Sequence, residues 1–403
     1  MFTKKPICNA PFANLYIDGN GNVTPCCFNR DDVFGNIYHH SIEEIWNSVN
    51  AIKLRKSLSK KEYPEGCTIC KKAIESNNYY NSGIFTYSKL KYKKQQIQAI
   101  DFELSYLCNL SCIMCNLHSK DYSLSEEQEN IILNKIKPLI SQLKKVRFYG
   151  GEPLLIPIYR KIWKLIVESN PKCNILLQTN GMLLDEELIS LTKKGNFTFN
   201  ISLDSLNPDT ASNIRRGSQL DLILINIKQI KKITRNDISL AVTPMILNWK
   251  EIPAIVNFAN KNSLQLFFND MVQPQKLSLW TLKSEELNEI NIYLSKYKFY
   301  PYNFIRFFNL KKYIGFIHHI KHLELQALNR PNYEKEELFH HTQTIYNIIN
   351  EKLPTISKID KNILFSKIQT ILFTKRVEEI EYFLMTNPAE VIENKIHEFL
   401  NKE

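Results

Sequence analysis

Three cysteines, Cys108, Cys112 and Cys115, lie within eight positions of the chain at the spacing C-x3-C-x2-C. Three thiolates at this spacing can hold three irons of a [4Fe–4S] cube, because thiolate sulfur is a ligand that suits soft iron. No fourth cysteine stands close by in sequence, so the motif predicts a cluster with one iron open to a ligand from outside the protein. A zinc site is the alternative, and it would require His118 or a more distant residue as its fourth ligand.

A second group of cysteines precedes this motif, with the spacings Gly21-x4-Cys26 and C-x2-C. The start of the chain has no signal-peptide pattern and no window is apolar enough to span a membrane, so we expect a cytoplasmic protein. Disulfides are rare in that compartment, and clustered cysteines there are first interpreted as metal ligands. The predicted ligands of this second site are Cys8, Cys26, Cys67 and Cys70. Either zinc or a cluster fits these four, and Cys27 competes with its neighbour Cys26 for the ligand position.

Strand-like apolar runs alternate with segments of helical spacing in the central part of the chain. The runs cover residues 99–106, 145–149, 174–179, 197–203, 238–245 and 264–268. This alternation predicts an α/β fold with a parallel sheet and right-handed crossovers. We expect a partial (β/α)6 TIM-type barrel at 81–275, with a doubly wound sheet as the alternative. A small cysteine-rich module at 1–80 would precede it, and a helical region at 276–403 would follow.

Glycine and polar residues follow these runs at corresponding places. They are Gly150, Gly151, Glu152 and Pro153 after the second run, Thr179 and Asn180 at the third, and Ser202 and Asp204 at the fourth. Gly-Gly or Asn-Gly alone would indicate no more than a turn. Because the carboxyl ends of parallel strands lie on one side of a sheet, these segments together predict a single site there.

Over residues 100–270 the cysteine motif and the strand-end segments resemble the radical S-adenosylmethionine (SAM) enzymes. The resemblance implies that Cys108, Cys112 and Cys115 hold a catalytic [4Fe–4S] cluster whose fourth iron is chelated by SAM. In that family one electron from the reduced cluster cleaves the sulfonium of SAM and yields a 5′-deoxyadenosyl radical, which abstracts hydrogen from a substrate. An electron donor such as flavodoxin or ferredoxin is implied as well.

The resemblance also implies which residues bind SAM. The segment Gly150-Gly151-Glu152-Pro153 matches the family's GGEP segment, whose carbonyls and carboxylate accept hydrogen bonds from the SAM amino group. An arginine in the segment Ile-Arg-Arg-Gly would neutralise the SAM carboxylate, and Arg216 competes with Arg215 for this role. The full set of implied residues is Gly150, Gly151, Glu152, Pro153, Thr179, Asn180, Ser202, Asp204 and Arg215. Met114 departs from the family, since many relatives have an aromatic residue before the third cysteine.

The amino-terminal cysteines resemble the SPASM and twitch modules that bind auxiliary [4Fe–4S] clusters in many of these enzymes. Four usable cysteines support one auxiliary cluster, which fits the shorter twitch type. The order departs from the commonest arrangement, in which the module follows the barrel.

The formal net charge of +11 invites a nucleic-acid partner, but no dense arginine cluster or RNA-binding signature accompanies it. We therefore favour a solvated basic surface, and we expect no membrane partner. Relatives with auxiliary modules commonly modify a peptide or protein, so the resemblance implies that substrate class. RNA modification and a zinc-stabilised binding module without catalysis are the alternatives.

Overall fold

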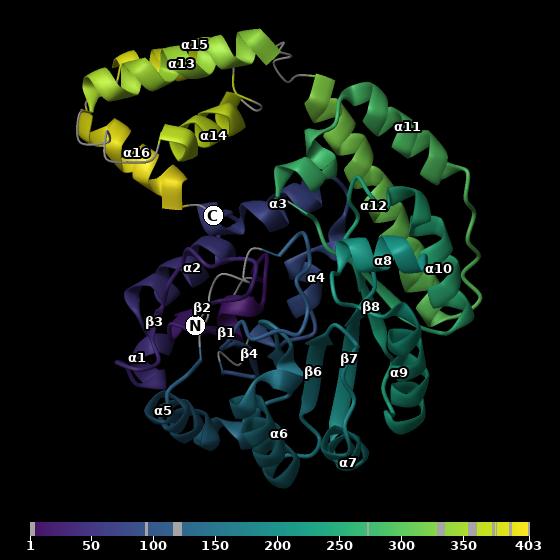
Figure 1. Ribbon diagram of the computed structural model, residues 1–403. Coiled ribbons are helices and arrows are strands. Elements are labelled where there is room, and N and C mark those ends of the chain that lie inside the picture. The colour runs from purple at the N-terminus through teal and green to yellow at the C-terminus, as the bar shows by residue number, and fades with distance from the viewer. Residues whose placement is uncertain are drawn as a thin grey trace. The chain divides into compact units, whose positions relative to one another are not determined.

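The computed structural model describes residues 5–92, 96–115, 123–271, 274–328, 335–353, 361–372, 375, 377–386 and 389–401. His118, the alternative fourth ligand, lies outside the described residues. The chain divides into two compact units, residues 1–279 with 288–322 and residues 280–287 with 323–403. Figure 1 shows the order of the elements along the chain.

A single nine-stranded sheet organises the first unit, with the strand order β3-β2-β1-β4-β5-β6-β7-β8-β9. Its strands are β1 (Asn14–Asp18), β2 (Asn22–Thr24), β3 (Gly35–Asn36), β4 (Ala99–Glu103), β5 (Lys145–Phe148), β6 (Asn174–Thr179), β7 (Asn196–Ser202), β8 (Ser239–Val242) and β9 (Gln265–Phe268). The six strands from β4 to β9 run parallel, and each falls on one of the six apolar runs predicted above. The predicted α/β class and parallel sheet are thus confirmed.

The amino-terminal segment is part of this sheet. Strands β1 and β2 form an antiparallel hairpin, and β1 then pairs in parallel with β4, with Leu15 opposite Ile100. The cysteine-rich module therefore extends the barrel sheet by three strands at the β4 edge. The domain limits at residues 80 and 275 stay predictions.

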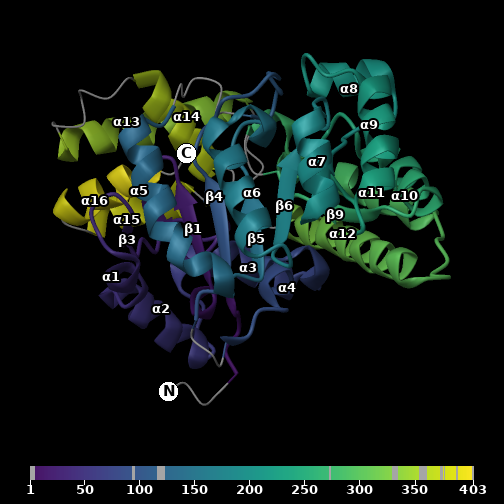
Figure 2. The same ribbon diagram turned by 90° about the horizontal axis from the view of Figure 1, so that it is seen from below.

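Sixteen α-helices accompany the strands in the described part of the chain. They are α1 (Ile42–Trp46), α2 (Val49–Ser59), α3 (Thr68–Glu75), α4 (Gly83–Tyr87), α5 (Glu126–Ile136), α6 (Pro157–Ser169), α7 (Glu186–Lys194), α8 (Pro208–Ile214), α9 (Leu220–Ile233), α10 (Ile252–Lys261), α11 (Ser284–Ser295), α12 (Phe304–Leu328), α13 (Lys335–Lys352), α14 (Lys361–Leu372), α15 (Val377–Thr386) and α16 (Ala389–Asn401). Figure 2 shows α5, α6 and α7 along one face of the sheet.

Local sequence explains several helix starts. Ser41 and Glu44 form a capping box at α1, in which each side chain binds the other residue's main-chain N–H. Ser125 and Gln128 do the same at α5. These contacts satisfy N–H groups that the first turn of a helix leaves without partners.

Aromatic packing between β5 and α6 fixes which strand residues face outward. The rings of Phe148 and Trp163 meet edge to face at 5.7 Å, and both side chains are fully buried. Because side chains alternate across a strand, Lys145 and Arg147 of the same strand face the opposite, inner side. That inner face carries the polar and charged groups described below.

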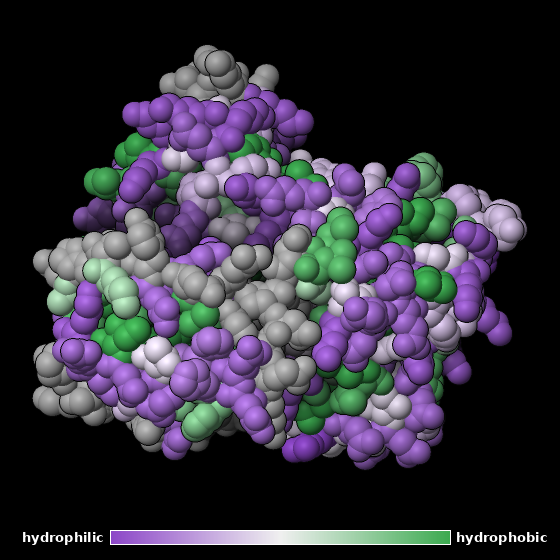
Figure 3. All heavy atoms as spheres, turned by 90° about the horizontal axis from the view of Figure 1, so that it is seen from above, coloured by the Kyte–Doolittle hydropathy of each residue, from purple (hydrophilic) through white to green (hydrophobic). Residues whose placement is uncertain are grey.

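The second unit contains a helical core built from α13 to α16. Its buried residues are Ile345, Ile349, Leu353, Leu364, Ile368, Leu372, Val377, Leu384 and Ile392. None of the helices that the structure describes is both long and apolar enough to cross a membrane. On the face drawn in Figure 3, hydrophilic residues predominate and apolar residues form separate small patches.

Candidate cluster and cofactor site

The loop after β4 carries the C-x3-C-x2-C motif, and its three cysteines are partly buried. Two main-chain hydrogen bonds tie this loop to the Gly-Gly-Glu-Pro segment after β5. Gly151 N donates to Ser105 O at 3.0 Å, and Glu152 N donates to Leu107 O at 2.7 Å. A Cβ atom at Gly151 would lie 2.0 Å from Leu107 O, so a larger residue cannot approach the loop as closely.

The end of α8 and the residues directly after it hold the other side of the cysteine loop. Ser111 N donates to Arg216 O, and Ile113 N donates to Ile214 O, both at 3.0 Å. The cysteine loop is therefore held between two segments that lie far from it in sequence. Met114, which departs from the family pattern, packs with Ile113 against a small apolar cluster that includes Ile214.

Arg215 directs its guanidinium toward the cysteine loop. Its Nε donates to Asp204 Oδ2 at 2.7 Å, and its NH1 group lies 3.8 Å from Cys112 Sγ. The second oxygen of Asp204 accepts a hydrogen bond from Thr243 N at 2.7 Å. Of the two competing arginines, Arg215 thus supplies a positive charge beside the cysteines, whereas Arg216 supplies the main-chain carbonyl described above.

Glu152 is fully buried and binds the end of β6. Its Oε1 accepts from Thr179 Oγ1 and its Oε2 accepts from Asn180 N, both at 2.8 Å. Burial raises the pKa of this carboxyl, and the hydrogen bonds from Asn180 and Thr179 oppose that rise. Asn180 Nδ2 in turn donates to Asn109 Oδ1 at 2.8 Å within the cysteine loop. Glu152 therefore positions the loop, and its role toward the SAM amino group stays a prediction.

The remaining predicted SAM-binding residues lie at the same ends of the strands. Ser202 accepts a hydrogen bond from Gln178 Nε2 at 3.2 Å. Pro153 begins the short 3-10 helix Pro153–Leu155. Gly150 has a φ of 114°, a left-handed conformation that favours glycine. The structure thus brings Gly151, Glu152, Asn180 and Arg215 into direct contact with the cysteine loop, and the contacts of the whole predicted set with SAM remain predictions.

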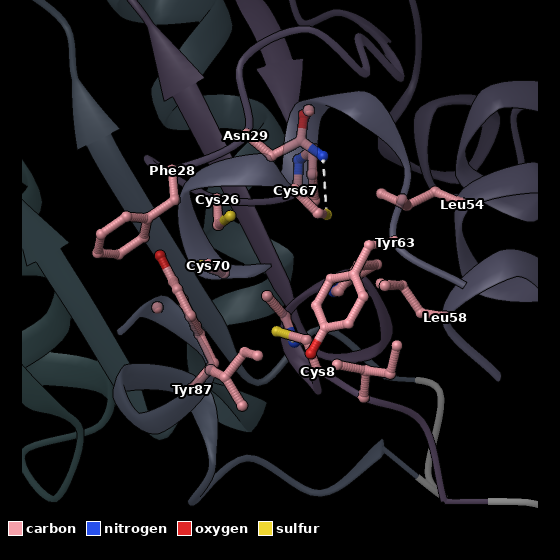
Figure 4. Close-up of a pocket in the computed structure, with 17 residues that line it drawn as sticks. Cys8, Cys26, Phe28, Asn29, Leu54, Leu58, Tyr63, Cys67, Cys70 and Tyr87 are labelled. Atoms are coloured by element: carbon pink, nitrogen blue, oxygen red, sulfur yellow. Dashed lines mark hydrogen bonds between the residues drawn. The ribbon is translucent and has the colours of Figure 1, made fainter. Parts of the chain in front are cut away.

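The amino-terminal cysteines surround a small apolar cavity, shown in Figure 4. Its lining includes all four predicted ligands, Cys8, Cys26, Cys67 and Cys70. Cys27 does not line this cavity. Its Sγ lies 3.7 Å from Tyr87 Oη, and the residue lines a second cavity on the inner face of the sheet. Position therefore favours Cys26 over Cys27 as the ligand.

The donor set of four thiols around one cavity fits a cluster, and it also fits zinc. Burial raises the pKa of Cys8 to about 12 and that of Cys67 to about 11, and neighbouring cysteines add to both shifts. Such thiols stay protonated at neutral pH unless a metal centre displaces the proton. A Cβ at Gly83 would lie 2.9 Å from Cys70 Sγ, so glycine leaves room at the edge of the cavity.

No three or more His, Cys, Asp or Glu side chains of the described residues are arranged to hold a single metal ion. A [4Fe–4S] cube does not require that arrangement, because each of its cysteines binds a different iron.

Sequence reasoning missed the charged residues inside the sheet. Arg147 NH1 lies 2.7 Å from Asp101 Oδ1, and the two side chains are 3% and 0% exposed. Tyr87 Oη also donates to Asp101, at 2.5 Å. The available signal was the charged alternation in Lys145-Val-Arg147-Phe, which places two cations on one face of a strand.

Two parts of the chain match families of known proteins. Residues 102–259 match the model of the radical SAM superfamily, and residues 8–71 match that of the iron–sulfur cluster-binding domain SPASM. GTP 3′,8-cyclase of Clostridium perfringens (strain SM101) is 31% identical over 187 residues, which is 44% of this chain and 56% of that protein. The enzyme of the same name from Petrotoga mobilis is 32% identical over 179 residues, which is 43% of this chain and 55% of that protein. The chain thus spans little more than half the length of these relatives.

Two solved structures give weaker likenesses. Native anSMEcpe with bound AdoMet is 17% identical, with 48% of this chain and 57% of that chain covered and a TM-score of 0.38. Streptococcus suis SuiB bound to its precursor peptide SuiA is 15% identical, with 72% and 69% covered and a TM-score of 0.40.

The two family matches coincide with the two cysteine sites. The cysteine loop held by the Gly-Gly-Glu-Pro segment falls within residues 102–259, and the four-cysteine cavity draws its cysteines from residues 8–71. This chain carries a radical SAM domain, preceded by an iron–sulfur cluster-binding domain of the SPASM type.

Proposed function

We propose that this chain is an enzyme that reductively cleaves SAM at a [4Fe–4S] cluster held by Cys108, Cys112 and Cys115. The observation that carries the proposal is the cysteine loop held between the Gly-Gly-Glu-Pro segment and the Arg215 segment. When bound, the cluster and SAM supply a 5′-deoxyadenosyl radical that can take hydrogen from carbon. An auxiliary cluster on Cys8, Cys26, Cys67 and Cys70, of the twitch type, belongs to the same proposal.

The chain's own residues prepare this site. Burial lowers the pKa of the Arg215 guanidinium, but Asp204 and the Cys112 sulfur outweigh this effect and raise that pKa overall. Arg215 therefore keeps a positive charge beside Cys112. That charge would attract the carboxylate of SAM. Gly150 and Gly151 let main-chain carbonyls approach a bound amino group, while Glu152 fixes their segment against β6. A flavodoxin or ferredoxin would deliver the electron.

The substrate in this proposal is a peptide or protein. The support is the SPASM match at residues 8–71, since relatives with such modules commonly modify peptides, together with a net charge of +11 that suits an acidic peptide. A nucleotide is the second candidate, because relatives that are 31–32% identical are named GTP 3′,8-cyclase. RNA modification, the third, predicts binding that weakens steeply with salt.

SAM cleavage can be tested directly. The protein is reconstituted anaerobically with iron and sulfide, and SAM and dithionite are then added. We expect 5′-deoxyadenosine, measured by mass spectrometry, and its loss in Cys112→Ala. Cys173→Ala is the matched control, because Cys173 is buried in the core and lines neither cluster site. An intact cluster that yields no 5′-deoxyadenosine would refute the proposal.

Metal analysis tests the catalytically inactive alternative. Two cubes correspond to roughly eight irons with matching sulfide per chain, whereas a zinc module would hold one or two zincs and be colourless.

A further inference from the structure

A second cavity lies on the inner face of the sheet and has a volume of about 580 Å³. Its lining residues come from β5 to β9, from the amino-terminal module, from the α4 region and from α12. Cavities of roughly 300–1,000 Å³ are typical of small-molecule sites. This one has space for a metabolite or for a few residues of a peptide.

All the charged side chains that line this cavity are positive. Lys89, Lys145, Arg147 and Lys312 line it, and no aspartate or glutamate is among its lining residues. Asp101 compensates Arg147 through the buried ion pair described above. Among the described residues, none of the three lysines has a carboxylate within ion-pair distance, and the ammonium group of Lys312 donates to the main-chain oxygen of Leu266.

In two of these lysines the surroundings disfavour the charged form of the side chain. Burial, together with the positive charges of Arg147 and Lys89 and against an opposing effect of Asp101, lowers the pKa of Lys145 to about 7. Burial alone lowers the pKa of Lys312 to about 8. An anion placed between Lys89 and Lys145 would relieve both the desolvation and the repulsion.

The uncharged residues that line the cavity could bind the uncharged part of a substrate. Gln178, Asn200 and Ser239 lie side by side on β6, β7 and β8 and bind one another through their side chains. Phe85 and Phe308 form an aromatic part of the lining, with ring centroids 6.2 Å apart. The cavity therefore offers hydrogen-bonding groups and an apolar surface in addition to its cations.

The length of β5 gives the distance between Lys145 and the predicted SAM site. Lys145 begins this strand, and Tyr149, also a lining residue, directly precedes Gly150. Four residues of extended chain span about 13 Å. A group bound at Lys145 would therefore lie at the opposite end of the strand from the predicted SAM site.

We propose that the substrate carries an anionic group, a carboxylate or a phosphate, which Lys89 and Lys145 bind at the start of β5 while the reacting carbon extends toward Gly150. This proposal rests on the function proposed above. It gives the peptide candidate an acidic side chain or carboxyl terminus, and it gives the nucleotide candidate its phosphates, as the anchoring group.

Calorimetric titration of the reconstituted protein tests the anchor. The probes are inorganic tripolyphosphate and a pentaglutamate peptide, compared at equal ionic strength. We expect at least one of them to bind, and binding to weaken about tenfold in Lys145→Met, because one charge-assisted contact is lost. Lys145→Arg keeps the charge and is expected to restore most of the affinity. Lys193→Met is the control, since Lys193 is exposed on α7 and its loss changes net charge equally.

Tighter binding of tripolyphosphate would identify a phosphate anchor, and tighter binding of the peptide a carboxylate anchor. The proposal is overturned if neither probe binds the wild-type protein, or if Lys193→Met weakens binding as much as Lys145→Met does. Formation of 5′-deoxyadenosine by the wild-type protein is measured in parallel. Its absence would refute the proposed function and leave the binding result intact, so the two failures can be distinguished.

Discussion

Replacement of Gly151 by alanine tests the contact between the cysteine loop and the Gly-Gly-Glu-Pro segment. The new Cβ would lie 2.0 Å from Leu107 O, whereas ordinary contact begins at 3.4 Å, so the two segments would have to separate by about 1.4 Å. Such a shift breaks the hydrogen bonds of Gly151 N and Glu152 N, worth about 1 kcal/mol each. Overpacking adds about 1–3 kcal/mol. We therefore expect Gly151→Ala to lower the free energy of unfolding by about 3–5 kcal/mol.

Gly217→Ala is the matched control beside the same loop. Gly217 has a φ of 91°, but a Cβ there would meet no atom closer than 3.4 Å. Only backbone strain of about 1–2 kcal/mol is expected. Urea denaturation measures the free energy of unfolding, and iron and sulfide content after reconstitution measures the cluster sites. The reasoning fails if Gly151→Ala is as stable as Gly217→Ala and retains the iron content of the wild-type protein.

Three further predictions concern the amino-terminal cluster and the inner face of the sheet. Cys26→Ala should reduce the iron content of the reconstituted protein by about half while Cys27→Ala leaves it unchanged, and the opposite result would assign the ligand to Cys27. Arg147→Met should lower the free energy of unfolding by about 3–5 kcal/mol because it leaves Asp101 charged and buried, and Arg147→Met with Asp101→Asn should recover part of that loss in urea denaturation. The pKa of Lys145 is lowered from 10.5 to about 7, so the unfolded chain binds more protons between these values and the free energy of unfolding should rise with pH across that window. Comparison of urea denaturation at several pH values with that of Lys145→Met isolates this effect, and an identical pH dependence in both proteins would contradict it.

Much of the fold follows from local pattern. The apolar runs at 145–149 and 174–179 became β5 and β6 almost residue for residue, because periodicity within a few residues decides both strand identity and which side chains share a face. The same local rule placed the polar segments at the strand ends. The parallel pairing of β1 with β4 did not follow, since a strand's partner depends on packing between distant segments.

The predicted sites, too, depend partly on local sequence and partly on contacts between distant segments. The spacing of Cys108, Cys112 and Cys115 indicated a cluster without any structure, because ligand geometry within one short loop is a local property. Contacts between segments that lie far apart in sequence decided the positions of other site residues. They placed Arg215 beside Cys112 and Cys26 in the four-cysteine cavity.

The sequence by itself determined where metal chemistry can occur, since cysteine type and spacing favour iron–sulfur ligation and glycines after strands permit close approach to a cofactor. Only the tertiary structure decided what surrounds that chemistry. It placed Lys89 and Lys145, which lie 56 positions apart, in the lining of one cavity, and it placed Asp101 against Arg147. The physical reason is that electrostatic environment depends on distance and burial in space, which sequence separation does not report.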